Sequence, residues 1–92
     1  MIYKIIVLEE AIEDIAFLKK HEISAYHKIT QLMDELRKHP RFGTGKPELL
    51  KYGQFKGLWS RRITSKHRLV YSIKDNEITV LVLSAKGHYG DR

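Results

Sequence analysis

The hydrophobic pattern of this 92-residue chain changes its period once, and that change limits the folds that the chain can adopt. Before Pro40, apolar residues recur at the three- and four-residue spacing of amphipathic helices. After the stretch RFGTGKPE at 41–48, which is rich in Gly and Pro, they alternate with a period of two, as in strands with one buried face. This order predicts a helical pair followed by a sheet.

Charged breaks and short turns divide the two halves into elements. The predicted elements, in order, are a strand at 1–8, helices at 9–20 and 23–39, and strands near 49–52, 58–63, 68–73 and 78–86. Short turns between the last three strands indicate an antiparallel meander. The predicted fold is a two-layer α+β domain, in which the N-terminal strand and an α-hairpin pack on a small twisted antiparallel sheet. Residues 1–92 are expected to form this single domain.

Each predicted helix carries one apolar stripe, and the two stripes are expected to face the core. The stripe of the first helix is predicted to comprise Ile12, Ile15, Ala16 and Leu18. The stripe of the second helix is predicted to comprise Ile23, Tyr26, Ile29, Leu32 or Met33, and Leu36.

Arginines are built into the predicted strands. Along 68–73, Leu69 and Tyr71 share the face that is expected under the helices, so Arg68 points to the opposite, open face. Along 58–63 the same alternation separates Arg61 from Arg62, so at least one of this pair is also expected on the open face. A sheet is a more rigid platform for a site than a loop.

Positive charge is concentrated in the C-terminal half. Residues 1–39 hold six Lys/Arg and seven Asp/Glu, whereas residues 40–92 hold eleven Lys/Arg and four Asp/Glu. A C-terminal half with this excess of positive charge attracts polyanions such as nucleic acid. A generic solubilising surface is the alternative, because small basic domains are common. The sequence has no membrane-length apolar run, no signal-peptide pattern and no Cys, so a cytoplasmic protein without a membrane partner is expected.

Two common kinds of site do not match the sequence. The segment GTGKPE resembles part of a phosphate-binding loop, but Pro40 and Pro47 stand where that motif needs Gly and Ser or Thr. The five His residues lack metal-binding spacing. No metal and no cofactor are therefore expected.

The remaining polar residues suggest acid–base chemistry. The candidate site residues are Glu48, Lys51, Arg61, Arg62, Arg68, Lys86, His88 and Tyr89. RNA cleavage without a metal needs a base that takes the 2′-OH proton, an acid that protonates the leaving 5′-oxygen, and cations around the phosphorane. A carboxylate, an imidazole and guanidinium groups can fill these roles.

The stretch GTGKPELLKYGQFKGLWSRRITSKHRLVYSI, followed by HY near the C-terminus, resembles the Txe/YoeB family of bacterial toxin–antitoxin systems, within the RelE-like superfamily. The match extends in order over nearly the whole chain. The resemblance implies an mRNA interferase: a ribosome-dependent endoribonuclease that cuts mRNA in the decoding (A) site, in contact with 16S ribosomal RNA, and so inhibits translation. It also implies an acidic YefM/Axe-like antitoxin as partner, and it leaves a homodimer open.

The resemblance also assigns roles to residues. The general base falls on Glu48, the phosphate-stabilising arginine on Arg68, and the C-terminal catalytic pair on His88 and Tyr89. Lys51 and Arg62 match family positions near phosphate or RNA, and Arg61 and Lys86 are further RNA- or phosphate-binding candidates from the inventory of charged residues. The expected core or platform residues are Trp59 and Tyr71.

Two other functions could use the same basic sheet. One is a non-catalytic RNA- or ribosome-binding module, and the other is a domain whose basic groove binds an acidic partner peptide. Glu48 distinguishes them from an enzyme. A carboxylate among cations repels phosphate and adds nothing to a groove that only binds RNA, whereas a base catalyst requires it.

Overall fold

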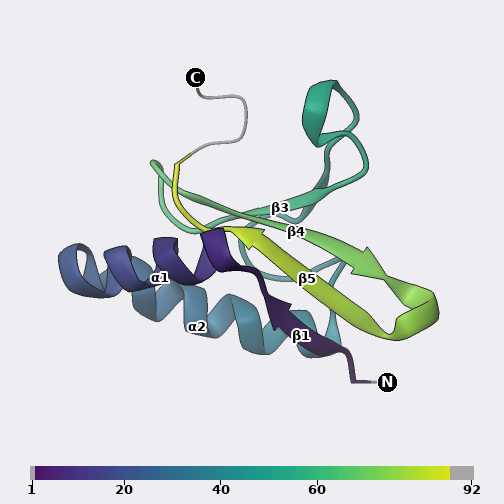
Figure 1. The fold of residues 1–92 in the computed structure, drawn as a ribbon, viewed down its shortest axis with the longest axis horizontal. Coiled ribbons are helices and arrows are strands. Elements are labelled where there is room, and N and C mark those ends of the chain that lie inside the picture. Colours follow the sequence, from purple (N-terminus) through teal and green to yellow (C-terminus); the bar gives the residue numbers. More distant parts are fainter. Residues whose placement is uncertain (1, 88–92) are drawn as a thin grey trace.

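The computed structural model describes residues 2–87 and shows two layers, a pair of helices and a twisted sheet (Figure 1). The described elements are, in chain order, β1 (Lys4–Val7), α1 (Glu9–His21), α2 (Ile23–Lys38), β2 (Glu48–Leu49), the 3₁₀ helix η1 (Gly53–Phe55), β3 (Trp59–Arg62), β4 (Arg68–Lys74), the 3₁₀ helix η2 (Asp75–Glu77) and β5 (Thr79–Ser84). Both α-helices cover the same face of the sheet. The predicted two-layer α+β architecture is confirmed.

Within residues 2–87 the strands form one sheet in the order β1-β5-β4-β3-β2. The pairings of β3 with β4 and of β4 with β5 are antiparallel, as the short turns predict, and β2 also pairs antiparallel with β3. The pairing of β1 with β5 is parallel, with Lys4 opposite Thr79. The sheet is therefore mixed: the N-terminal strand, which was predicted to pack with the helices on an antiparallel sheet, is instead the parallel edge strand of that sheet. A parallel pair has no short turn between its strands, so the local sequence of β1 does not reveal its partner.

The helices bury one stripe each, and Ile15 and Leu18 of α1 face the core as predicted, whereas the predicted members Ile12 and Ala16 are exposed. Ala11 and Leu18 are fully buried and Ile15 packs against the core, which is a run of i, i+4 and i+7 positions. Ile12, expected in this stripe, is 56% exposed, and Ile23 at the start of α2 is also exposed. The buried residues of α2 are Ala25, Ile29, Leu32 and Leu36.

Arg61 lies on the helix face of the sheet and is fully buried. It stands opposite Leu69, which belongs to the core together with Tyr71. Because cross-strand partners share a face, Arg61 points toward α2 and the exposed Arg62 points away from it. This corrects the prediction that Arg61 contacts RNA or phosphate, since no part of the residue is exposed.

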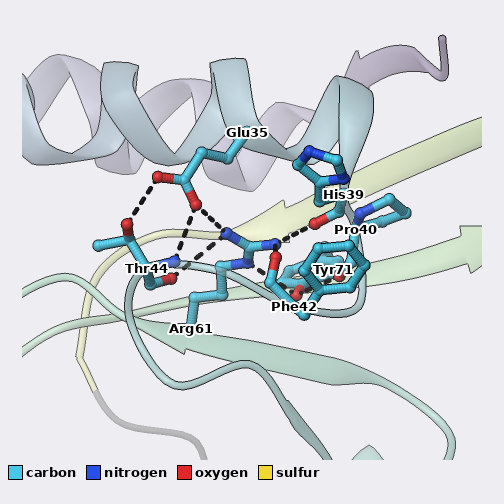
Figure 2. A network of polar contacts seen from close by, with 7 residues as sticks. All are labelled: Glu35, His39, Pro40, Phe42, Thr44, Arg61 and Tyr71. Atoms are coloured by element: carbon cyan, nitrogen blue, oxygen red, sulfur yellow. Dashed lines mark hydrogen bonds and ion pairs between the residues drawn. The ribbon is translucent and has the colours of Figure 1, made fainter.

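The Arg61 guanidinium binds partners from α2, the following loop and β4 (Figure 2). It donates to Glu35 Oε1 at 2.9 Å and to the Tyr71 hydroxyl at 3.2 Å. The backbone carbonyls that accept from its Nη atoms belong to His39, Phe42 and Thr44. A buried charge is expensive to desolvate and is tolerated only when it is paired and hydrogen-bonded. The network therefore fixes the end of α2 and the 39–45 loop against the sheet.

The glycines of the GTG segment make room for this network. Gly43 and Gly45 have φ values of 126° and 88°, a region that side chains rarely adopt. A Cβ at Gly43 would lie 2.5 Å from Glu35 Oε1, and a Cβ at Gly45 would lie 2.8 Å from the carbonyl oxygen of Arg62. A phosphate-binding loop points N–H groups at an anion. The 39–45 loop instead points carbonyl oxygens at a cation.

Removing the buried guanidinium should severely destabilise the fold. We expect Arg61→Ala to lower the free energy of unfolding by about 3–5 kcal/mol, because it leaves Glu35 and several loop carbonyls without their donor. The neighbouring change Arg62→Ala, on the exposed face, should cost less than about 0.5 kcal/mol. Urea denaturation of both variants measures the difference, and equal losses would contradict the structural role of Arg61.

Glu35 should make the stability depend on pH. The hydrogen bond from the Thr44 hydroxyl is the main cause that holds the pKa of Glu35 below its ordinary value, with further contributions from the Thr44 N–H and Arg61. Its stabilisation is therefore complete above the ordinary value, near pH 4.5, and is lost as the pH falls through the lower pKa of the folded state. The free energy of unfolding, measured in urea from about pH 6 to pH 3, should fall less steeply in Glu35→Gln than in the wild type. Identical slopes would argue against this contribution.

Candidate active site

Glu48, Arg62 and Arg68 lie on the face of the sheet opposite the helices, which we call the outer face. Glu48 is paired with Ser60, and Arg62 is paired with Arg68. Ser60 and Arg62 are two residues apart on β3, so they share the face that is opposite to Arg61. The structure thus brings together three predicted site residues from three neighbouring strands.

The spacing within this group follows from the strand pairing. Directly opposed residues have Cβ atoms about 5 Å apart, as for Arg62 and Arg68, and diagonal neighbours are about 7–8 Å apart, as for Glu48 and Arg62. Like charges in direct opposition destabilise a sheet. An anion held by both guanidinium groups would offset that cost. The outer face is therefore suited to a phosphate group beside a carboxylate.

A groove of about 730 Å³ opens at the β2 edge of the sheet. Its lining residues are Arg41, Pro47, Glu48, Leu49, Leu50, Lys51, Tyr52 and Trp59. The groove brings Lys51 together with Glu48, and it adds Tyr52, an 86% exposed aromatic ring. The teal segment with η1 rises nearby, on the side away from the helices (Figure 1). Trp59 packs partly against the core and Tyr71 is fully buried in it, so their predicted structural placement is confirmed.

The Lys86 side chain contacts α1. Its ammonium group stands 4.1 Å from the centroid of the Phe17 ring of α1, a cation–π contact in the helical layer. Its assignment to RNA binding stays a prediction that this contact does not favour. His88 and Tyr89 lie outside the described residues, so their roles also stay predictions.

The described part of the chain ends beside Arg68. The Ala85 N–H donates to Asp14 Oδ2 at 3.0 Å, and the Gly87 N–H donates to Nδ1 of His67 at 2.9 Å. The Arg68 N–H donates to the Gly87 carbonyl at 3.0 Å. Neither Asp14 nor His67 is among the site residues predicted from the sequence. The one signal for His67 was its position directly before Arg68 in the matched motif.

Among residues 2–87, no three His, Asp or Glu side chains are grouped closely enough to hold a metal ion. In the same range, no helix combines the length and the apolar character that crossing a membrane requires.

Comparison with known proteins identifies the family. Residues 7–89 match the model of the YoeB-like toxin of bacterial type II toxin–antitoxin systems. The chain is 42% identical over 80 residues to Toxin YoeB of Mycobacterium bovis, which covers 87% of this chain and 91% of the relative. It is 38% identical over 86 residues to Toxin YoeB of Escherichia coli K12, which covers 94% of this chain and 99% of the relative.

Solved structures agree with the sequence comparison. The YoeB/ParE toxin from Agrobacterium tumefaciens superposes with a TM-score of 0.85 at 32% identity, covering 94% of this chain and 99% of that one. The toxin in the heterotetrameric YoeB–YefM complex from Staphylococcus aureus gives 0.78 at 33% identity, covering 95% and 98%. The S. aureus YoeB dimer gives 0.80 at 34% identity, covering 97% and 100%. This chain belongs to the family of YoeB-like toxins of bacterial type II toxin–antitoxin systems.

Proposed function

We propose that this toxin is a ribosome-dependent endoribonuclease that cuts mRNA at the outer face of its sheet and thereby inhibits translation. The observation that supports this most directly is the presence of Glu48 on the same face as the opposed pair Arg62 and Arg68. Membership of the toxin family supports a toxic activity. The constellation of a carboxylate and two guanidinium groups supports the type of reaction.

In the proposed reaction, Glu48 takes the proton of a ribose 2′-OH, and the 2′-oxygen attacks the adjacent phosphorus. Arg68, with Arg62 opposite it, stabilises the charge on the phosphorane oxygens. The bond from phosphorus to the 5′-oxygen breaks, and His88, assisted by Tyr89, protonates the leaving oxygen. The products are a 2′,3′-cyclic phosphate and a 5′-OH. Side chains supply both proton transfers and the charge stabilisation, so the proposed reaction uses no metal ion or cofactor.

The proposed partners are mRNA in the ribosomal A site, with contacts to 16S ribosomal RNA, and an acidic antitoxin. These partners place the toxin in the cytoplasm. The S. aureus relative forms a complex with YefM, and another structure shows it as a dimer, which supports a comparable antitoxin and a homodimer here. An acidic segment is complementary to residues 40–92, which hold eleven basic and four acidic side chains.

The change Glu48→Gln tests catalysis against simple binding. It keeps the size of the side chain and removes the proposed base, so cleavage of ribosome-bound mRNA in single-turnover assays should fall about 10²–10⁴-fold. Binding, measured by cosedimentation with ribosomes, should be unchanged or tighter, because the amide does not repel phosphate. In cells without antitoxin, the wild type should arrest growth and the variant should not.

Glu77→Gln, in the exposed η2 segment, provides the matched control and should leave cleavage unchanged. A wild-type protein that binds ribosomes without cutting mRNA would favour the non-catalytic module. A Glu48→Gln variant that cuts at the wild-type rate would reject Glu48 as the base.

Arg68→Ala should lose about 10²–10³-fold in cleavage rate, because it removes a preorganised cation from the charged phosphorane. The fold should persist, since Arg68 is on the outer face and not in the apolar core. Lys74→Ala removes an exposed cation at the other end of β4 and should cut normally. Circular dichroism and melting temperature establish the folded state of both variants. A folded Arg68→Ala protein with wild-type activity would refute this role.

A further inference from the structure

His67 is a buried, oriented residue in the turn between β3 and β4. Its side chain is only 9% exposed. Its backbone carbonyl accepts from the N–H groups of Ile63 and Thr64, at 2.9 and 3.2 Å. Its own N–H donates to the Thr64 hydroxyl at 3.2 Å. These hydrogen bonds within the turn fix the backbone of His67, and with it the position from which the imidazole ring extends.

The two ring nitrogens of His67 bind different partners from different parts of the chain. A backbone N–H can only donate, so Nδ1, 2.9 Å from the Gly87 nitrogen, must carry the lone pair. The proton of the neutral ring is therefore on Nε2, which lies 3.1 Å from Oε2 of Glu22 at the junction of α1 and α2. The hydrogen bond from His67 is the main cause that holds the pKa of Glu22 below its ordinary value. Glu22 thus orients the ring so that Nδ1 faces Gly87.

Gly87 is held on both sides by two consecutive residues. His67 accepts from its N–H, and the Arg68 N–H donates to its carbonyl at 3.0 Å. Gly87 has a φ of 78°, a left-handed conformation that glycine adopts at little cost. Gly87 is therefore fixed relative to Arg68, which carries the guanidinium that we assign to the phosphate.

We propose that His67 is a positioning residue for RNA cleavage. Its Nδ1 accepts from the Gly87 N–H and so fixes Gly87 beside Arg68. Gly87 directly precedes His88 and Tyr89 in the sequence, so fixing Gly87 sets the start of the segment that carries these two residues. This inference rests on the proposed function, because it matters only if those two residues act on the substrate. β5 ends at Ser84, and beyond it Gly87 is held by the N–H of Arg68, the first residue of β4, and by the ring of His67. Misplacing a reacting group by about 1 Å can cost about 10²-fold in rate.

Two substitutions separate the two nitrogens. In His67→Asn the side-chain oxygen can take the place of Nδ1, so the acceptor for Gly87 is kept and the contact with Glu22 is lost. In His67→Gln the amide nitrogen can take the place of Nε2, so the contact with Glu22 is kept and the acceptor for Gly87 is lost. Both variants remove the ring, so packing losses are similar.

Single-turnover cleavage of ribosome-bound mRNA and hydrogen exchange of the Gly87 amide test the proposal together. We expect His67→Gln to lose about 10²-fold in kcat with KM changed by less than about threefold, and to lose protection of the Gly87 amide. His67→Asn should keep that protection and stay within about tenfold of the wild-type kcat. Glu77→Gln, the matched control used above, should keep both the cleavage rate and the protection of the Gly87 amide.

Two results would overturn the role of His67 alone: equal losses of rate in the Asn and Gln variants that follow their melting temperatures, or wild-type cleavage by a Gln variant whose Gly87 amide is unprotected. A wild-type toxin that binds ribosomes and cuts no mRNA would instead reject the proposed function, and this role with it. The exchange of the Gly87 amide would then still report whether the contact exists.

Discussion

The buried Arg61 network is the interaction on which the rest of this structure depends. One guanidinium joins Glu35 of α2, carbonyls of the 39–45 loop and Tyr71 of β4. These groups come from three parts of the chain, and the network exists only when the helical layer is seated on the sheet. Because adjacent residues of a strand face opposite ways, burying Arg61 also obliges Arg62 to stand on the outer face. A contact that stabilises the fold thereby orients a residue of the candidate site.

The sequence predicted the order of the elements because period and turn chemistry are local properties. It could not separate Arg61 from Arg62, because alternation shows that two neighbours face opposite ways without showing which one faces inward. That choice is made by the partners of Arg61, such as Glu35, which is 26 residues away in the sequence. In the first turn of α1, Ala11 is buried and the more apolar Ile12 is exposed, so hydrophobicity alone does not show which of these two neighbours faces the core.

The candidate site was predicted best where it depends on the strands. Glu48, Arg62 and Arg68 share a face because pairing between β2, β3 and β4 puts them there. The role of Lys86 stays a prediction, and its surroundings depend on how the N-terminal half of the chain meets the segment after β5. β1 pairs with β5, and the helix that follows β1 brings Asp14 to Ala85 and Phe17 to Lys86. No local pattern encodes that parallel pairing.

The two groups of the proposed catalytic machinery are therefore held in place by different means. Arg62, Arg68 and Glu48 are positioned by backbone hydrogen bonds between strands. Backbone hydrogen bonds of this kind form with many different side chains on the strands. The described residues after Ser84 are not part of a strand. The side chains of Asp14, Phe17 and His67, together with the backbone N–H of Arg68, hold the segment from Ala85 to Gly87. The position of this segment therefore depends on the identity of a few side chains, and replacing one of them removes a contact that the backbone cannot restore. Substitutions that disturb alignment without unfolding the protein should therefore concentrate around this segment, and those that unfold it should concentrate around Arg61.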